Sequence, residues 1–473
     1  MKKFTILFLL IIGTANLTQA QWGGDVRLTN DTAISYVNNL QCIVASGDSI
    51  HVVWVDNRDG NIEIYYKRST NKGISWGTDT RLTNAVDTSY YPFIGLSGSN
   101  LHVVWSDKRD GNDEIYYKHS TDGGLSWGAD TRLTNDPGRS IGNSMAVSGS
   151  NIYVVWDDNR EGTYKSFFKR STDGGNTWGS DLKISSTSTN PPSIAVSGSD
   201  VHVVWPSAVF GNWEIVYKHS TNSGDSWGSE TRLTNNVANS FIPRIQISGS
   251  FVHVIWIDDR DGNYEIYYKQ SVDKGLTWGV DTRLTNASGD SWYSRLAVSG
   301  LGVHIVWQDN RNGKEEIFYK CSKNGGESWS SDTLLTNNNG TLSGYPSVAL
   351  SGSMVFVAWY DKRDGPNGEI YFKCNPTGNP TGVNDLKQVE TEFMLYPNPA
   401  SGNLSISISN TELSNKTISI FNSLGIEVKQ FNEKELSGKS TISFSIESHP
   451  TGVYYCLMSD GIGKTSRSFV VLR

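Results

Sequence analysis

Hydrophobic and polar residues alternate along most of this chain in short runs, and the same order of runs returns many times. In one stretch the runs are FIGLSG (93–98), LHVVWSD (101–107), EIYYKHS (114–120) and DTRLTN (130–135). Alternation with a period of two, together with many β-branched and aromatic residues, predicts β-strands. The Gly-Ser, Asp-Gly and Gly-Gly pairs between the runs predict turns. Each such unit therefore predicts four short antiparallel strands.

The unit repeats with a nearly constant period. A tryptophan closes the second predicted strand in seven units, at spacings of 51, 51, 49, 51, 51 and 52 residues. These residues are Trp54, Trp105, Trp156, Trp205, Trp256, Trp307 and Trp359. A period of this size indicates a repeat array in which each unit buries its apolar faces against its neighbours. Four-stranded units repeated radially are typical of a β-propeller, which has about 4 to 8 blades.

The two ends of the array predict how the ring closes. The segment QWGGDVRLTN (21–30) has the sequence of the last part of a unit, whereas the seventh unit ends after EIYFKC (369–374) without such a part. We expect the N-terminal segment to supply the outer strand of the seventh blade, which covers strand edges that would otherwise be exposed. The predicted fold is all-β, with a seven-bladed β-propeller over residues 21–374 closed by its N-terminal strand.

Composition and the N-terminus indicate an exported protein. Two lysines, an apolar run (4–12) and the small-residue site Thr18-Gln19-Ala20 predict a signal peptide over residues 1–20. No later run is long and apolar enough for a transmembrane segment. We expect the protein to be secreted or on the outer cell surface after export to the periplasm. The net charge of -7 argues against a nucleic-acid partner, because phosphate binding needs a basic face.

The cysteines do not predict a metal site. Cys42, Cys321, Cys374 and Cys456 lie far apart and lack the spacing of metal ligands. Export permits disulfides. Cys321 and Cys374 follow a repeated lysine at the end of equivalent strands in adjacent units, so they are the pair that the sequence favours for a disulfide.

The turn between the third and fourth strands carries a recurring motif. It reads STDGGLSW at 120–127, STDGGNTW at 171–178 and SVDKGLTW at 271–278, and asparagine replaces the aspartate at 69–76, 220–227 and 322–329. The motif is similar to the Asp box, Ser-x-Asp-x-Gly-x-Thr-Trp, of sialidases and related propellers with the BNR repeat. The resemblance implies their propeller fold, with the boxes on the face away from the active site.

The residue types of this motif favour a structural role. The carboxylate or amide accepts hydrogen bonds from turn amides, and the tryptophan fills space between strands. The predicted structural residues are Asn71, Trp76, Asp122, Trp127, Asp173, Trp178, Asn222, Trp227, Asp273, Trp278, Asn324 and Trp329.

The enzymes that the fold resembles cleave terminal sialic acid with a Tyr nucleophile assisted by Glu, an Asp acid/base and three arginines that bind the substrate carboxylate. Their early Arg-Ile-Pro motif is absent, because Arg27 belongs to the repeated RLTN and IPRI (242–245) has a changed order. Arg139, Arg244 and Arg295 lie at or near the start of innermost strands. They form the candidate arginine cluster, with isolated or salt-bridged arginines as the alternative, and no other catalytic residue is assigned.

A second motif, Asp-x-Arg-Asp-Gly or a close variant, follows the repeated tryptophan in six units and joins the second and third strands. It lies on the same face as the loops into the innermost strands. Three interpretations compete: a brace in which the arginine pairs with nearby carboxylates, an oxygen-rich calcium site, and capture of a polar ligand. An arginine in the loop repels a divalent ion, and one function rarely needs six copies. The brace is favoured, no cofactor is predicted, and calcium is the alternative.

Histidine recurs at one strand position, and the fourth unit lacks the Asp-x-Arg motif. Five units place His51, His102, His202, His253 and His304 where the others have Tyr153 and Phe356, which predicts packing rather than a shared zinc site.

The fourth unit reads PSAVFGNWE (206–214) in place of the charged motif. Further aromatic residues occupy the loops into the innermost strands, among them Tyr90 and Tyr345. Aromatic rings beside hydrogen-bonding groups suit sugar stacking or a protein contact, with local loop packing as the alternative. The predicted ligand-binding residues are Tyr91, Phe210, Trp213, Phe241, Trp292 and Tyr293.

The C-terminal part has a different pattern. A Pro/Gly/Asn-rich linker is predicted over 375–391. Alternating segments in 392–473 then predict a small β-sandwich. LYPNPASGNLSI (395–406), FNSLGIEV (421–428) and PTGVYYCLMSDGIGKTSRSFVV (450–471) resemble the C-terminal sorting domain of the type IX secretion system of Bacteroidetes. The resemblance implies the secretion machinery as a partner.

The sequence thus favours an exported propeller that binds a glycan or protein ligand without catalysis. The alternative is a sialidase-like exo-glycoside hydrolase. An active site of that kind would gather the arginine cluster, a Tyr/Glu pair and an Asp in one funnel.

Overall fold

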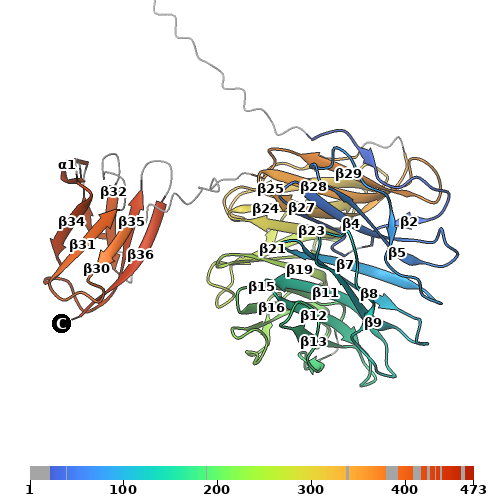
Figure 1. The fold of residues 1–473 in the computed structure, drawn as a ribbon, viewed down its shortest axis with the longest axis horizontal. Helices are drawn as coiled ribbons and strands as arrows, with labels where there is room; N and C mark the ends of the chain where they lie inside the picture. The colour runs from blue at the N-terminus through green and yellow to red at the C-terminus, as the bar shows by residue number, and fades with distance from the viewer. Residues whose placement is uncertain are drawn as a thin grey trace, which may run out of the picture. The chain divides into compact units, whose positions relative to one another are not determined.

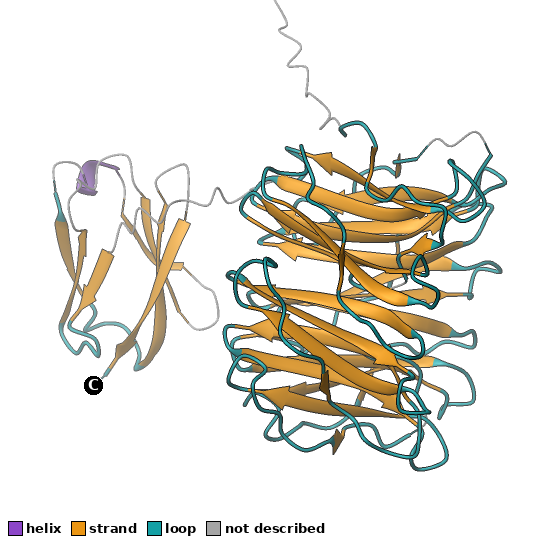
Figure 2. Ribbon diagram, turned by 45° about the vertical axis from the view of Figure 1, so that its right-hand side comes forward, coloured by secondary structure: helices purple, strands orange, loops and turns teal. Residues whose placement is uncertain are grey.

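The computed structural model of the protein describes residues 22–38, 40–187, 189–336, 340–379, 393–408, 417–422, 427–431, 433–436, 439–459 and 464–472. The predicted signal peptide and the linker from residue 380 onward lie outside these residues. The chain divides into two compact units, Met1–Gly382 and Val383–Arg473. Almost all regular structure is β-strand, as predicted (Figure 2). Within the described residues, no helix has the length and apolar character needed to cross a membrane.

The first unit contains seven sheets among its described residues, each built around one repeat (Figure 1). The first strands are β2 (Ser35–Tyr36) with β3 (Ile43–Ser46), β7 (Ser89–Ser97), β11 (Ser140–Ser148), β15 (Ser193–Ser197), β19 (Ser240–Ser248), β23 (Ser291–Ser299) and β27 (Ser343–Ser351). The second strands are β4 (Ser49–Asp56), β8 (Asn100–Asp107), β12 (Asn151–Asp158), β16 (Asp200–Ser207), β20 (Phe251–Asp258), β24 (Gly302–Asp309) and β28 (Met354–Asp361).

The outer half of each sheet comes from two more strands. The third strands are β5 (Glu63–Ser69), β9 (Glu114–Ser120), β13 (Lys165–Ser171), β17 (Glu214–Ser220), β21 (Glu265–Ser271), β25 (Glu316–Ser322) and β29 (Glu369–Asn375). The fourth strands are β6 (Thr80–Arg81), β10 (Thr131–Arg132), β14 (Leu182–Lys183), β18 (Thr231–Arg232), β22 (Thr282–Arg283), β26 (Thr333–Leu334) and, for the seventh sheet, β1 (Val26–Arg27).

The first strands surround a common axis. Each contacts the first strand of the next repeat, from β3 through β27 and back to β3. Residues from all seven of these strands line one central channel. The second strands lie inside their sheets, between the first and third strands, and are buried over almost their whole length. The seven repeated tryptophans are 0–1% exposed. This arrangement of antiparallel sheets around an axis is a β-propeller.

The ring closes through the N-terminal segment, as the sequence predicts. Strand β1 pairs with β29, and Val26 lies opposite Phe372. Trp22 packs edge-on against Tyr319 of the sixth repeat, with ring centroids 5.0 Å apart. Asp25 forms an ion pair of 2.8 Å with Lys373. The seventh sheet therefore joins the two ends of the propeller.

Neighbouring sheets are joined by a ring of aromatic pairs. Each Asp-box tryptophan packs edge-on against a ring on the third strand of the preceding repeat, at 4.9–5.2 Å between centroids. The pairs are Trp76–Phe372, Trp127–Tyr66, Trp178–Tyr117, Trp227–Phe168, Trp278–Tyr217 and Trp329–Tyr268. The Trp22–Tyr319 pair completes the ring.

All four cysteines are free, so the disulfide favoured by the sequence, Cys321–Cys374, does not form. At the same position in other repeats, Arg68 and Arg170 donate to the Asp-box turn of the following repeat, at Gly123 O and Ser223 O. Side chains at this position therefore face a turn of the next sheet rather than the equivalent residue of that sheet.

The first strands begin earlier than the alternation predicts. Strand β7 begins at Ser89 rather than Phe93, and its register with β8 shifts between Tyr90 and Phe93. The same bulge occurs in β11, β19, β23 and β27. A bulge inserts a residue and breaks the period of two, so pattern reading places the strand start after it.

The second unit has two antiparallel sheets, in the orders β30-β31-β34 and β33-β32-β35-β36, which enclose a separate core that includes Leu404, Ile418 and Phe469. Its elements are β30 (Phe393–Tyr396), β31 (Asn403–Ile408), β32 (Thr417–Asn422), β33 (Glu427–Phe431), α1 (Glu433–Leu436), β34 (Thr441–Ser445), β35 (Gly452–Ser459) and β36 (Lys464–Val471). This is the β-sandwich that the sequence predicts.

Candidate functional site

A cavity of about 530 Å³ opens at the centre of the propeller, where the first strands begin. Residues near the starts of six repeats line it, including Tyr91, Gly142, Pro191, Phe241 and Trp292. The surface is mostly apolar, and none of the lining residues is an aspartate or glutamate. Large apolar pockets with a few polar groups are the usual form of a binding site for a small ligand.

The wall of the cavity is a row of aromatic rings. Phe241 lies 6.4 Å from Tyr264, Tyr264 lies 6.3 Å from Trp292, and Trp292 lies 6.0 Å from Tyr293, measured between ring centroids. Across the cavity, Tyr91 is 42% exposed and packs against Tyr90 at 4.7 Å. The bulges of the first strands place Tyr91 and Tyr293 here, because they turn the third residue of each strand out of the regular alternation.

Two of the three candidate arginines are buried and interact electrostatically, and one of them lines this cavity. Arg244 lines it, and Arg295 occupies the equivalent position of the next repeat; they are 7% and 4% exposed. Burial lowers the pKa of Arg244 to about 9. Burial and the neighbouring charge of Arg244 lower the pKa of Arg295. Each guanidinium is thus desolvated and within the electric field of the other.

Arg139 is not part of this pair. Its side chain is 52% exposed and forms an ion pair with Asp113, with Nε 2.6 Å from Oδ2. Asp113 also accepts a hydrogen bond from the hydroxyl of Tyr90. Arg139 therefore matches the alternative of a salt-bridged arginine near the rim.

The predicted aromatic residues divide into two groups. Tyr91, Phe241, Trp292 and Tyr293 line the cavity, and Phe210 and Trp213 do not. Phe210 is 43% exposed, and the guanidinium of Arg232 lies 4.1 Å from the centre of its ring. Trp213 is partly buried, and its carbonyl accepts a hydrogen bond of 2.7 Å from the amide of Ser240. These two residues lie in the rim loop of the fourth repeat, between β16 and β17.

Pattern reading missed two lining residues for which the sequence carries a signal. Tyr264 follows Asn263 in the rim motif, at a position that is Asp113 in the second repeat. Leu40 belongs to the first repeat, whose segment between Tyr36 and Cys42 is longer than its counterparts. An aromatic residue at a variable rim position and an insertion before an inner strand were the available signals.

One buried carboxyl group lies directly behind the cavity wall. Asp157 is 2% exposed and pairs in register with Ile141, which lines the cavity. Burial raises the pKa of Asp157 to about 7. Its carboxyl group accepts hydrogen bonds from Thr189 and Ser166, at 2.7 and 3.3 Å.

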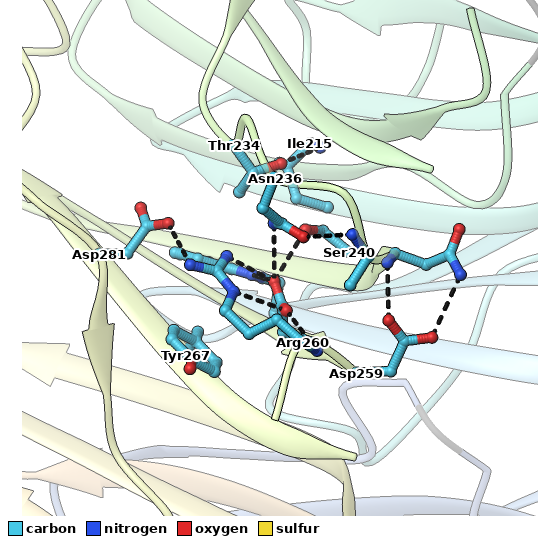
Figure 3. Close-up of polar contacts among 12 residues, drawn as sticks. Ile215, Thr234, Asn236, Ser240, Asp259, Arg260, Tyr267 and Asp281 are labelled. Carbon is cyan, nitrogen blue, oxygen red and sulfur yellow. Dashed lines mark hydrogen bonds and ion pairs between the residues drawn. The ribbon is translucent and has the colours of Figure 1, made fainter. Parts of the chain in front are cut away.

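The repeated Asp-x-Arg motif forms a buried brace, shown for the fifth repeat in Figure 3. Asp258 accepts hydrogen bonds from the indole of Trp256, the hydroxyl of Ser240 and the guanidinium of Arg260, at 2.6–2.9 Å. Arg260 also donates to Asp281 at 2.9 Å and lies 4.3 Å from the ring centre of Tyr267. Burial alone would raise the pKa of Asp258, but these hydrogen bonds outweigh it and lower the pKa.

The same brace recurs in the other repeats that carry the motif. Its aspartates, each 0–1% exposed, are Asp56, Asp107, Asp158, Asp258, Asp309 and Asp361. Each accepts a hydrogen bond from the indole of its repeated tryptophan. In the described residues, no group of three or more His, Cys, Asp and Glu side chains could hold a metal ion. The donor set therefore suits a brace.

The Asp-box side chains bind their own turns. Asp122 accepts hydrogen bonds from the amides of Leu125 and Ser126 and from the hydroxyls of Ser120 and Ser126, at 2.6–3.0 Å. These hydrogen bonds, chiefly those from Ser126, lower the pKa of Asp122. Asn71 accepts from the amide of Ser75 and donates to its hydroxyl in the same way. The contacts are those expected of a structural turn.

The histidines of the second strands are also part of the packing. In five repeats the imidazole Nδ1 lies 2.7–2.8 Å from a tyrosine hydroxyl on the third strand. Where the second strand has Tyr153 or Phe356, the third strand has Phe168 or Phe372, which lack that hydroxyl. Burial lowers the pKa of His253 to about 4, so the ring is neutral at physiological pH.

Comparison with known proteins supports both parts of the fold. Residues 394–472 match the family described as the secretion system C-terminal sorting domain. The chain is similar to phage phi92 endosialidase, with 10% identity, a TM-score of 0.48, and coverage of 94% of this chain and 87% of that one. It is also similar to Trypanosoma rangeli sialidase (11%, 0.42, 83% and 85%) and to polysaccharide lyase Uly1 (9%, 0.50, 75% and 99%). No curated protein sequence matches the chain.

These findings define the class of protein. The chain is a β-propeller followed by a type IX secretion sorting domain. The sorting domain implies an interaction with the secretion machinery and indicates a secreted or cell-surface protein. At these sequence identities the structural likeness concerns the fold alone.

Proposed function

We propose that the protein is an exported carbohydrate-binding propeller whose binding site is the aromatic cavity at the centre of the ring. The observation that carries this proposal is the gathering of Tyr91, Phe241, Trp292 and Tyr293 around one cavity of about 530 Å³. The apolar C–H face of a sugar ring packs on such aromatic faces, and a few polar groups fix its orientation. Asn190 and Arg244 are polar residues of the lining that can do so.

The route to the cell exterior follows from the two ends of the chain. The predicted signal peptide, residues 1–20, directs export to the periplasm, and the C-terminal domain directs the protein to type IX secretion. The propeller then meets its ligand outside the cell or at its surface.

The test is a glycan-array screen of the mature chain, residues 21–473, followed by calorimetry with the best ligand. We expect Trp292→Ala to weaken binding by about tenfold or more, because truncation removes a stacking surface. Phe210→Ala is the matched control, since Phe210 is exposed outside the cavity, and it should bind as the wild type does. Absence of binding to every glycan would overturn the proposal in favour of a protein ligand.

Sialidase-like hydrolysis is the second candidate, and two observations favour it. Arg244 and Arg295 lie together, and Asp157 is a carboxyl group whose raised pKa suits a general acid. However, the cavity lining contains no Asp or Glu for the Tyr/Glu pair and the acid/base. Release of sialic acid from a fluorogenic substrate, abolished by Arg244→Ala, would establish hydrolysis; its absence would support binding alone.

A further inference from the structure

The third residue of the first strand is unusual in five repeats, because its backbone is left-handed. Gly142 takes this conformation in the third repeat, with φ 67°, and Ile242 takes it in the fifth, with φ 47°. Glycine does so without strain. Tyr91, Tyr293 and Tyr345 adopt it with φ of 55°, 50° and 53°. A bulky residue in this region costs about 1–2 kcal/mol. Since the repeat accepts glycine here, the fold itself does not require tyrosine.

These three tyrosines belong to one row of rings around the mouth of the cavity. Tyr293 contacts Tyr345, with centroids 4.7 Å apart. Burial and the neighbouring phenols of Tyr293 and Tyr36 raise the pKa of Tyr345 to about 12, and burial and the phenol of Tyr91 raise that of Tyr36. The phenol of Tyr36 therefore interacts electrostatically with those of Tyr345 and Tyr91.

The row extends beyond the cavity. Tyr91 and Tyr293 line the cavity, whereas Tyr345 and Tyr36 do not. Beyond the cavity, the ring of Tyr345 lies 6.5 Å from that of Tyr360, measured between centroids. An aromatic surface that continues past a single pocket suits a ligand built from repeating units.

We propose that Tyr91, Tyr293 and Tyr345 form a tyrosine platform that binds several consecutive sugar units of a polysaccharide chain. This inference rests on the proposed carbohydrate binding and adds that the ligand is a polymer bound along its length. Backbone strain is retained where it serves a binding site, and here it turns three rings to the mouth of the cavity. Stacking on successive rings adds binding free energy with each sugar unit that reaches a ring.

The experiment measures affinity against chain length. Calorimetry of the mature chain is carried out with β-1,4-glucan, β-1,4-xylan and α-1,4-galacturonan oligosaccharides of one to six units. For the ladder that binds, we expect affinity to rise by about tenfold or more from the shortest to the longest ligand. Tyr345→Gly should reduce this gain while leaving binding of the shortest ligand unchanged. Tyr345→Phe, which keeps the ring, should bind as the wild type does.

Thermal unfolding separates a binding role from a structural one. Tyr345→Gly relieves the left-handed strain but removes the packing of the ring, and these effects oppose each other. We therefore expect its melting temperature to be close to that of Tyr345→Phe. If affinity is the same for all lengths, or if Tyr345→Gly leaves binding of long ligands intact while Trp292→Ala weakens it, the platform is wrong and the cavity site remains. If none of the ladders binds and the glycan array is also negative, the proposed function itself fails.

Discussion

The carboxylate of Asp107 is fully buried, and each of its hydrogen bonds comes from its own sheet. Trp105, Ser89 and Arg109 donate to it at 2.7–3.0 Å. The fourth repeat replaces three members of this brace together: Ser207, Val209 and Val216 stand where Asp107, Arg109 and Tyr116 stand in the second repeat. We therefore expect these side chains to act as one unit.

The first prediction concerns this brace. Asp107→Ala leaves the buried indole of Trp105 without its acceptor and Arg109 without one of its two carboxylate partners, the other being Asp130. We expect the free energy of unfolding to fall by about 3–5 kcal/mol, as when one partner of a buried ion pair is removed. Urea unfolding followed by tryptophan fluorescence measures the change.

The fourth repeat supplies the matched control. The triple variant Asp107→Ser, Arg109→Val, Tyr116→Val copies that repeat and removes the charges together, so it should lose less stability than Asp107→Ala alone. A larger loss in the triple variant would show that the three side chains contribute independently.

At the scale of elements, contacts between sheets depend on the Asp-box turn. A Cβ at Gly124 would lie 2.0 Å from the hydroxyl of Tyr66 in the preceding repeat, whereas a Cβ at Gly123 would meet nothing closer than 3.9 Å. Both glycines have a positive φ, 81° and 70°. The two positions therefore have similar backbone conformations and differ in how closely the preceding sheet packs against them.

This difference gives the second prediction. Gly123→Ala should cost about 1 kcal/mol from backbone strain alone, and Gly124→Ala should cost about 1–3 kcal/mol more, because it forces the Asp-box turn away from Tyr66. Differential scanning calorimetry of both variants measures the contrast. Equal melting temperatures would mean that the turn does not pack against the preceding sheet as described.

The elements also show where sequence reading succeeds and where it stops. Alternation predicted the second and third strands nearly to the residue, because both are regular and bounded by glycine turns. It placed the start of β7 at Phe93 instead of Ser89, since the bulge at Tyr91 breaks the period. The residues that the bulges turn toward the cavity, among them Tyr293, were predicted from their aromatic character and not from the strand.

For the whole molecule, five buried histidines link stability to pH. Burial lowers the pKa of His51, His102, His253 and His304 to about 4 and that of His202 to about 3. In the unfolded chain a histidine has a pKa of about 6.5. Between these pH values the unfolded chain binds more protons, so stability is complete above the unfolded pKa and falls as the pH decreases.

The third prediction is that the propeller loses roughly 1–2 kcal/mol per histidine between pH 7.5 and pH 5. Asp157 acts in the opposite direction, because a raised carboxyl pKa favours the folded state as the pH falls. Urea unfolding at the two pH values measures the sum. The double variant His253→Phe, Tyr268→Phe copies the Phe356 and Phe372 pair of the seventh repeat and should reduce the loss by one histidine. An unchanged loss would show that other groups carry the pH dependence.

The sequence by itself determined the repeat, the strand order, the closure through β1 and the sorting domain. The first three follow from local alternation, turn residues and a constant period, and the sorting domain follows from the resemblance of its motifs to a known family. It also predicted the brace, because Asp and Arg recur together in six repeats.

Only the tertiary structure decided which of the candidate residues meet. Arg244 and Arg295 lie together and Arg139 does not, although all three lie near the starts of inner strands. Four of the six predicted aromatic residues line one cavity, and Phe210 and Trp213 lie on the rim. The physical reason is that the direction of a side chain depends on the bulge and on the packing of the next sheet, which residues distant in the sequence create.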